Sequence, residues 1–228
     1  MKILQKEKET ANDNVVKIKD CYYDNKEFAI IMELCDTNLY NHLLDKGRGL
    51  NSKEIYYILS QLNNSFEIMN KNGILHRALR IENILIKYKD KEVKDQFIAK
   101  LKLTEDCCSL EDSYKLLPDK YFENRWIYAL EVLNEGEYTK ESDLWSLGIL
   151  IYLLYFKEEY PFLGENKEEV IKSIIEHKLE RLNEINKHKL ERLNEIDNPD
   201  LFDLINKLLV LEPKKRISWE EYFEHPFF

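Results

Sequence analysis

Glycine and proline are scarce in this chain of 228 residues, which contains only six glycines and five prolines. Motifs that depend on glycine, such as the loops that wrap phosphate groups, therefore have few residues to draw on. No stretch approaches the roughly 18 uninterrupted apolar residues that a membrane-spanning helix requires. The N-terminus also lacks the apolar core of a signal peptide. These absences predict a cytoplasmic protein without a membrane span.

Cysteine is rare as well, with four residues in the whole chain. In the absence of a secretion signal, these cysteines are expected to be reduced thiols. Cys107 and Cys108 are adjacent, which raises the question of a metal or redox role. No histidine or second cysteine pair lies at ligand spacing, so the sequence favours free thiols over a metal site.

Positive charge is outweighed by negative charge: 34 lysines and arginines stand against 43 aspartates and glutamates, for a net charge of −9. Proteins that hold nucleic acids through their phosphates typically present a basic surface, so this balance argues against such a partner. The chain is 44% hydrophobic and 34% charged, which is ordinary for a soluble globular protein. Its length is enough for one large domain or two small ones.

Two strands are predicted near the N-terminus, after a polar segment over residues 1–13 that is expected to be helical. Residues 15–18 and 28–32 are apolar and rich in β-branched side chains, and the turn-forming pair Asp24 and Asn25 lies between them. Taken alone, this pattern predicts an ordinary β-hairpin.

A long helix is predicted to begin after Asn51. The Asn51 side chain can accept a hydrogen bond from the backbone N–H of Glu54, whose own side chain reaches back, which is a capping box. Apolar residues then recur at three- and four-residue steps: Ile55, Ile58, Leu59, Leu62, Phe66 and Met69. Asn72 and Gly73 end the helix, because glycine adopts the closing left-handed conformation at low cost. The stripe predicts a core helix that places His76 just beyond its end.

A second hairpin and a buried helix are predicted farther along. Residues 87–95 form a charged turn, and residues 97–103 alternate as a strand that places three apolar side chains on one face: Ala99, Leu101 and Leu103. Residues 144–156 are apolar on nearly all sides but too few to cross a membrane. This composition is typical of a helix buried in a core.

One stretch is repeated, because residues 177–185 recur unchanged at residues 188–196. An eleven-residue repeat fits about three helical turns, which puts its leucines on one face. The repeat is therefore either a docking helix or a duplication that lengthens a tolerant surface loop. We favour the duplication.

The segment over residues 76–86 reads His-Arg-Ala-Leu-Arg-Ile-Glu-Asn-Ile-Leu-Ile. It resembles the catalytic loop of protein kinases, whose pattern is His-Arg-Asp-Leu-x-x-x-Asn followed by a strand. Five further fragments follow the order of that family: a hinge at 31–35, Ala-x-Glu at 129–131, Asp-x-Trp-x-x-Gly at 143–148, Pro-x-x-Arg at 213–216 and His-Pro-x-Phe at 225–228. Within the family, the resemblance is greatest to Ser/Thr kinases of the calcium/calmodulin-dependent or autophagy-initiating kind.

The resemblance implies an α+β, protein-kinase-like fold. A residual small lobe is expected over residues 1–35, with the end of the regulatory helix, two strands and the hinge. A mainly helical large lobe is expected over residues 36–228. Neither a Gly-rich loop nor a Val-Ala-x-Lys strand precedes the hinge in the sequence, so the small lobe is expected to be truncated.

The resemblance also implies nucleotide contacts. The carbonyl of Glu33 and the N–H of Cys35 would bind adenine, with Leu85 beside them. Arg80 replaces the lysine that contacts the transferred phosphate, which keeps the charge but changes its geometry. ATP is thus the implied nucleotide, bound weakly or not at all.

Magnesium is the implied metal, and Asn83 matches one of its ligands in the family. The second ligand should follow the next strand, at Glu105 or Asp106. With Glu105 in that position Leu103 falls inward, whereas Asp106 would turn Thr104 toward the core. Glu105 is therefore the expected ligand.

The two residues after Glu105 depart from the family's Asp-Phe-Gly. Asp106 takes the place of the phenylalanine, and Cys107 takes the place of the glycine. An ionised carboxylate in an apolar stack costs several kcal/mol, so Asp106 is expected to turn outward or to take up a proton.

Three residues are implied to be structural. Arg216 would form a buried ion pair with Glu131. Asp143 would brace the backbone of the catalytic loop, which includes His76 and Arg77.

The decisive departure is Ala78, which replaces the aspartate that accepts the proton of the substrate hydroxyl. A methyl group can neither accept a proton nor orient a hydroxyl. The sequence therefore predicts a pseudokinase that serves as a binding or regulatory module for a protein partner. One alternative is an active ATP-dependent Ser/Thr kinase with an atypical loop and an upstream small lobe, and another is a nonfunctional truncated duplicate.

Overall fold

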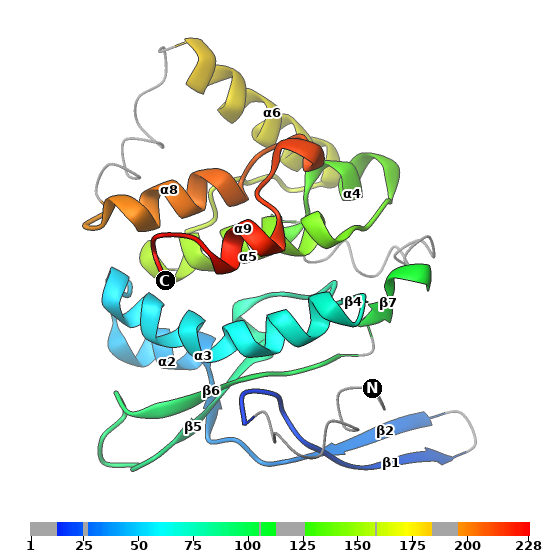
Figure 1. Cartoon of the computed structure of the whole chain (residues 1–228), viewed down its shortest axis with the longest axis vertical. Helices are drawn as coiled ribbons and strands as arrows, with labels where there is room; N and C mark the ends of the chain where they lie inside the picture. The colour runs from blue at the N-terminus through cyan, green and yellow to red at the C-terminus, as the bar shows by residue number, and fades with distance from the viewer. Residues whose placement is uncertain (1–12, 25–26, 105, 113–125, 158, 184–195) are drawn as a thin grey trace.

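The computed structural model describes residues 13–24, 27–104, 106–112, 126–157, 159–183 and 196–228. The helix expected over residues 1–13 therefore lies almost entirely outside the described residues. Helices and small sheets separate along the long axis of the molecule (Figure 1). The helices α4, α6 and α8 lie at one end, and the strands β1, β2, β5 and β6 lie at the other.

The described helices are α2 (Leu39–Lys46), α3 (Ser52–Lys71), α4 (Leu130–Glu135), α5 (Lys140–Tyr155), α6 (Lys167–Asn183), α8 (Pro199–Leu208) and α9 (Trp219–Phe223). The described strands are β1 (Ile18–Asp24), β2 (Glu27–Met32), β3 (Thr37–Asn38), β4 (Ile74–Leu75), β5 (Ile84–Tyr88), β6 (Phe97–Leu101) and β7 (Cys108–Ser109). They form three small sheets, with the strand orders β1-β2, β3-β5-β6 and β4-β7.

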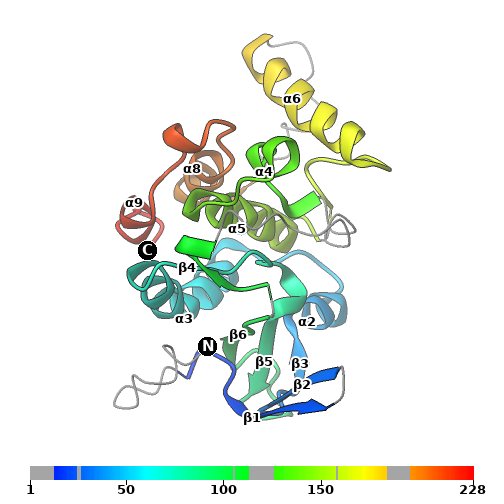
Figure 2. The same cartoon turned by 90° about the vertical axis from the view of Figure 1, so that its right-hand side faces the viewer.

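Helix α5 is the centre of the helical part, as the apolar run over residues 144–156 predicted. Every side chain from Ser142 to Leu154 is buried, because helices pack around it on several sides (Figure 2). Gly148 allows a close approach, since a Cβ there would lie 2.8 Å from a methyl carbon of Leu209, just past the end of α8. The burial of α5 fixes the residues at its N-terminal end, which face the catalytic loop.

Helix α3 has the predicted start, stripe and end. The Asn51 side chain accepts a hydrogen bond from the N–H of Glu54, and the Glu54 carboxylate accepts one from the N–H of Asn51. The predicted apolar stripe is buried. Gly73 follows the helix with φ +61°, and strand β4 starts directly after it. The helix therefore leads the chain straight to His76.

The N-terminal hairpin is present, but its first strand lies farther along the chain than predicted. Strand β1 begins at Ile18 instead of residue 15 and pairs antiparallel with β2. Val15 and Val16, which were expected to start this strand, form backbone hydrogen bonds with the end of β6 instead. The N–H of Val16 donates to the carbonyl of Leu101, and the N–H of Leu101 donates to the carbonyl of Asn14.

The second hairpin follows the prediction. Strands β5 and β6 pair antiparallel on either side of the charged turn. The apolar face of β6 is buried, including Leu101 and Leu103. Lys100 is also buried, on the opposite face of the strand, which alternation did not predict.

Two other expectations lie partly outside the described residues. The first copy of the repeat enters α6, whose backbone is described as far as Asn183. The second copy lies outside the described residues except for its last residue, Ile196, so its role stays a prediction. The boundary between the two expected lobes at residue 35 is likewise still a prediction.

No helix in the described parts of the chain combines the length and the apolar character needed to traverse a bilayer.

Candidate functional site

The loop over residues 76–83 follows β4 and is held by a carboxylate from α5. The backbone N–H groups of His76 and Arg77 donate to the two oxygens of Asp143, at 2.7 and 3.0 Å. The hydroxyl of Tyr138 donates to the same carboxylate at 2.7 Å. Arg77 has a φ of +63°, a conformation that costs a residue with a side chain about 1–2 kcal/mol. The brace expected of Asp143 is therefore present, and it stabilises a strained turn.

The pKa of Asp143 is set by opposing effects. Burial raises it to about 6, against the hydrogen bonds from Tyr138, His76 and Arg77, which lower it. The three donors face the ionised form, so they favour a charged carboxylate at neutral pH.

His76 is fully buried and neutral. Its Nε2 lies 3.1 Å from the carbonyl of Lys102, and its Nδ1 lies 3.3 Å from the backbone N–H of Ala78. An amide can only donate to Nδ1, so Nε2 carries the proton and donates to the carbonyl. Burial lowers the pKa of His76 to about 4. The ring thus connects the loop to the segment that follows β6.

Ala78 is buried, with 5% of its surface exposed. The side-chain amide of Asn83 donates to the carbonyl of Ala78 at 2.9 Å. The contact that positions Asn83 therefore involves the backbone of residue 78 and not its side chain. The amide nitrogen is engaged, which leaves the side-chain oxygen of Asn83 as the atom suited to a hard cation such as magnesium.

Three carboxylates among the described residues belong to the loop or to segments that contact it, and each has a partner there. Asp143 is occupied by its three donors. Glu82 lies 4.0 Å from the guanidinium of Arg80. Asp106 is bonded to Thr104.

Arg80 fits the expected phosphate contact in part. Its side chain is about one-third exposed at 32%, and its only ion pair in the described chain is the long one to Glu82. Its buried Nε forms no hydrogen bond with any described residue. A guanidinium with a donor to spare is suited to an anion. Leu85 is half-buried on β5, opposite Lys100 of β6.

The expected metal ligand Glu105 lies outside the described residues, so its role stays a prediction. Within the described chain, no group of three acidic, cysteine or histidine residues is arranged to hold a metal ion. Asn83 is therefore the one expected magnesium ligand whose placement is described. The fit to a metal rests on a single ligand.

Asp106 does not turn outward, which was one of the two alternatives expected for it; the other, uptake of a proton, stays a prediction. It is half-buried and folds back onto Thr104, whose hydroxyl donates to one carboxylate oxygen at 3.3 Å. The other oxygen is buried without a hydrogen bond to any described residue. A short local turn explains this placement: the Thr104 hydroxyl donates to the carboxylate and accepts from the backbone N–H of Asp106, also at 3.3 Å.

The adjacent cysteines occupy two different environments. The thiol of Cys107 lies 3.4 Å from the carbonyl of His76, and burial raises its pKa to about 12. Cys108 belongs to β7, which pairs with β4, and its sulfur accepts a hydrogen bond from Arg77 at 3.4 Å. All four cysteines of the chain are free thiols.

The hinge follows β2 and keeps its backbone groups available. The N–H of Glu33 donates to the carbonyl of Lys17, and the N–H of Asp36 donates to the carbonyl of Ile86. Among the described residues, neither the carbonyl of Glu33 nor the N–H of Cys35 takes part in a hydrogen bond. These two groups are therefore unpaired, as an adenine-binding hinge would require.

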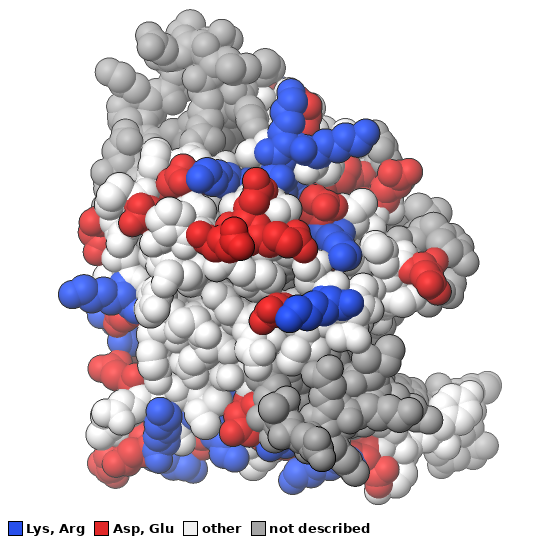
Figure 3. Space-filling view, in the orientation of Figure 1, with Lys and Arg blue, Asp and Glu red and all other residues white. Residues whose placement is uncertain are grey.

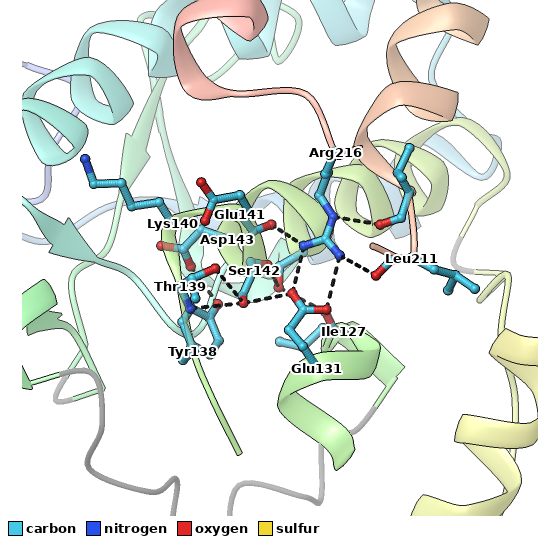
Figure 4. Close-up of polar contacts among 12 residues, drawn as sticks. Ile127, Glu131, Tyr138, Thr139, Lys140, Glu141, Ser142, Asp143, Leu211 and Arg216 are labelled. Carbon is cyan, nitrogen blue, oxygen red and sulfur yellow. Dashed lines mark hydrogen bonds and ion pairs between the residues drawn. The ribbon is translucent and has the colours of Figure 1, made fainter. Parts of the chain in front are cut away.

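The predicted pair of Arg216 and Glu131 is present (Figure 4). The guanidinium donates to both oxygens of the carboxylate, at 2.9 and 3.2 Å. It also donates to the carbonyls of Val210 and Glu141. The Arg216 side chain is fully buried and lies over the ring of Trp145. This network fastens α4 to α5 and to the segment after α8.

Two residues with clear roles were missed at the level of sequence. Tyr138 braces Asp143, and Lys100 supports the hinge through Glu33. The only available signal for Lys100 was a charged residue inside a strand, and Tyr138 had none.

On the face shown in Figure 3, basic and acidic side chains both occur, with a group of adjoining basic side chains at the upper right and a group of adjoining acidic ones below it.

Comparisons with known proteins identify one family. A family model described as the protein kinase domain matches residues 1–228. Calcium-dependent protein kinase 29 of Arabidopsis thaliana is 29% identical over 219 residues, which cover 96% of this chain and 38% of the relative. Calcium-dependent protein kinase 22 of the same plant is 32% identical over 221 residues, covering 94% and 42%. The MAPK/MAK/MRK overlapping kinase of Homo sapiens is 27% identical over 235 residues, covering 94% and 54%.

The fold has a match among solved structures. The crystal structure of the Rad53 kinase domain and SCD2 matches with a TM-score of 0.70, over 99% of this chain and 76% of that chain, at 21% identity. The α+β, protein-kinase-like fold expected from the sequence is therefore confirmed. This chain spans 38% to 54% of the curated relatives named above. Because the family model covers residues 1–228, this chain belongs to the protein kinase domain family.

Proposed function

We propose that this chain is a pseudokinase domain that serves as a binding or regulatory module for a protein partner. The observation that carries the proposal is Ala78, whose methyl group stands where the family has its proton acceptor. A positioned acid–base group is worth about 10²–10⁴ in rate. In the described chain, Asp143 is held by its three donors, Glu82 forms a long pair with Arg80, and one oxygen of Asp106 is bonded to Thr104, so we expect none of them to supply this function.

The other contacts of the loop support the proposal, because they hold the loop in place without an aspartate at residue 78. Asn83 is held by the backbone of Ala78, and Asp143 holds the turn before it. Such a loop can still present a surface to a partner or accept a nucleotide. The four free thiols suit a reducing compartment, and we place the protein in the cytoplasm.

Phosphate transfer to a basic protein substrate tests the proposal. Labelled ATP with magnesium is supplied to the wild-type chain and to Asn83→Ala, which removes the retained metal ligand. We expect both proteins to transfer phosphate at the same background rate. Robust transfer by the wild type that is abolished in Asn83→Ala would overturn the proposal.

Nucleotide binding is proposed as a residual property of the hinge. Its support is the unpaired carbonyl of Glu33 and N–H of Cys35. A ligand that binds only the folded state stabilises it by about 2.7 kcal/mol at 100 times its Kd. We expect ATP at millimolar concentration to raise the melting temperature, and GTP, which lacks the adenine edge, to raise it less. Equal shifts with both nucleotides, or none with either, would contradict adenine recognition.

An active Ser/Thr kinase is the second candidate. The observation that favours it is the intact placement of Asn83 and Asp143 in a member of the protein kinase domain family. Such an enzyme would need a base from outside the described residues. The same transfer assay distinguishes the two candidates, because only the active kinase loses activity in Asn83→Ala.

A further inference from the structure

A buried lysine lies at the junction of the hinge and the sheet. Lys100 belongs to β6, and only 3% of its side chain is exposed. Its ammonium group donates to the carboxylate of Glu33 at 3.1 Å and to the carbonyl of Asp13 at 2.5 Å. Lysines are almost never buried unless they are paired, so these acceptors explain why the side chain is inside.

The carboxylate of Glu33 receives a second donor. The backbone N–H of Lys17 donates at 2.8 Å to the same oxygen that accepts from Lys100. Burial would raise the pKa of Glu33, but the hydrogen bonds from Lys17 and Lys100 outweigh it and hold the pKa below its usual value. The Glu33 carboxylate is therefore ionised in the folded chain at neutral pH.

The pair connects segments that are far apart in the sequence. The N-terminal segment crosses β6, where the Asn14 side chain donates to the carbonyl of Ala99 at 2.8 Å. The hinge follows β2, and its residue Glu33 accepts a hydrogen bond from Lys100 on β6. Lys100 thus bonds both to the N-terminal segment, at Asp13, and to the hinge, at Glu33. Removing Lys100 would leave the backbone N–H of Lys17 as the remaining donor to the Glu33 carboxylate.

We propose that Lys100 is a positioning residue for adenine recognition: by binding Glu33, it holds the hinge backbone in the conformation that leaves the Glu33 carbonyl and the Cys35 N–H open to the base. This inference rests on the nucleotide binding proposed above. Lys100 does not touch the nucleotide and acts through Glu33. A hinge that is already ordered binds its ligand at a lower entropic cost.

The test compares Lys100→Met with Lys46→Met in the full chain. Lys46 is a matched control, because its ammonium group binds Glu54 at 2.7 Å in a largely buried pair at the end of α2, away from the hinge. The affinity for a fluorescent ATP analogue is measured at a temperature at which all variants are folded. We expect Lys100→Met to bind about tenfold more weakly than the wild type, and Lys46→Met to bind like the wild type.

Hydrogen exchange of the backbone over residues 33–36 gives a readout that does not need nucleotide. We expect exchange there to become faster in Lys100→Met and to stay unchanged in Lys46→Met. If Lys100→Met fails to fold, Glu33→Gln weakens the same pair and is expected to show the same two effects. Wild-type affinity together with wild-type exchange in the hinge variants would overturn the proposal.

Failure of the proposed nucleotide binding is distinguishable from failure of this inference. If the wild type binds no nucleotide, the exchange measurement still decides whether Lys100 positions the hinge. Faster exchange in Lys100→Met would then support the positioning role, and unchanged exchange would refute it.

Discussion

The carboxylate of Asp143 accounts for the shape of the catalytic loop at the scale of single residues. It accepts hydrogen bonds from two consecutive backbone amides and from the hydroxyl of Tyr138. Consecutive amides can point at one carboxylate only if the chain turns sharply, which explains the positive φ of Arg77. Of the three donors, only the Tyr138 hydroxyl belongs to a side chain, so its contribution can be measured by mutation.

Replacing Tyr138 with phenylalanine removes one donor and keeps the ring. Hydrogen bonds to charged groups contribute roughly 1.5–3 kcal/mol, and we expect Tyr138→Phe to lower the free energy of unfolding by that amount. Tyr128 is the matched control, because its ring lies 6.4 Å from that of Tyr138 and its hydroxyl forms no hydrogen bond with a described residue. Urea denaturation of both variants checks the prediction, and equal losses would contradict it.

His76 makes stability depend on pH. Its pKa is lowered by burial to about 4, so below its ordinary value of 6.5 the unfolded chain takes up a proton that the folded chain does not. The stabilisation that neutral His76 contributes to the folded chain is complete above pH 6.5 and is lost as the pH falls from 6.5 to about 4. Asp143 has the opposite effect on stability. Burial raises its pKa from 3.8 to about 6, so in this interval the folded chain binds a proton more readily than the unfolded chain, and stability rises as the pH falls.

The variant His76→Gln isolates this effect, since glutamine does not titrate. We expect the difference in unfolding free energy between wild type and His76→Gln to fall by roughly 3 kcal/mol between about pH 7 and pH 4. Denaturation curves of the two proteins at several pH values provide the measurement. A difference that is independent of pH would show that His76 is not held neutral.

Residue roles were predictable only where they belong to a motif. The sequence located Asp143 and Asn83 through the patterns that surround them. It did not indicate that Asp106 folds back onto Thr104, because this contact arises in a local turn that has no signature in the sequence. It also gave no indication of Tyr138, whose hydroxyl matters only because the fold brings it to Asp143.

At the scale of helices and strands, the ion pair of Arg216 and Glu131 joins α4 to the last part of the chain. Arg216 contacts four acceptor residues, so a lysine in its place could not satisfy them with its single ammonium group. Methionine would leave the Glu131 charge without its partner.

We expect Arg216→Met to lower the free energy of unfolding by roughly 3–5 kcal/mol, the usual cost of breaking a buried pair from one side. Lys215→Met is the control, because its pair with Glu212 is 70% and 66% exposed and should contribute less than about 1 kcal/mol. The double variant Glu131→Gln with Arg216→Met should lose less than the sum of the single variants. Thermal or urea unfolding measures all of these, and strict additivity would argue against a coupled pair.

Elements with a strong local pattern were predicted well. Helix α3 was recognisable from its capping box and apolar stripe, and α5 from its uniform apolar character. Strand β1 was misplaced because the apolar residues Val15 and Val16 do not pair within the hairpin. They lie against β6, a contact between segments about 85 residues apart that no local pattern encodes.

At the scale of the whole molecule, the core belongs to the helical part. The residues that form it come mainly from α3, α5, α8 and the strands beside them. The hairpin β1–β2 forms a sheet of its own and exposes large side chains, with Tyr22 at 53% and Tyr23 at 78%. Two-stranded hairpins are marginally stable in isolation.

We therefore expect the hairpin to open without the rest of the protein. Its amides should exchange with solvent on the order of a hundredfold faster than those of α5, because local opening needs less free energy than global unfolding. Hydrogen exchange followed by mass spectrometry resolves the two elements. Equal protection in β1–β2 and α5 would show that they unfold together.

The family was predictable from the order of its motifs, each of which is weak alone. Each motif supplies a contact between separate parts of the fold. Asp143 binds the loop that contains His76, and Arg216 connects the end of the chain to Glu131. The contribution of Lys100 could not be predicted, because it depends on the meeting of three separate segments.

The bond from Asn83 to the carbonyl of residue 78 has a consequence for how such domains evolve. A carbonyl is common to all amino acids, so this anchor is indifferent to the side chain that residue 78 carries. Natural selection could therefore discard the acidic group while the architecture was inherited intact. For the same reason, restoring an aspartate there would demand no rebuilding of its surroundings beyond room for the carboxylate.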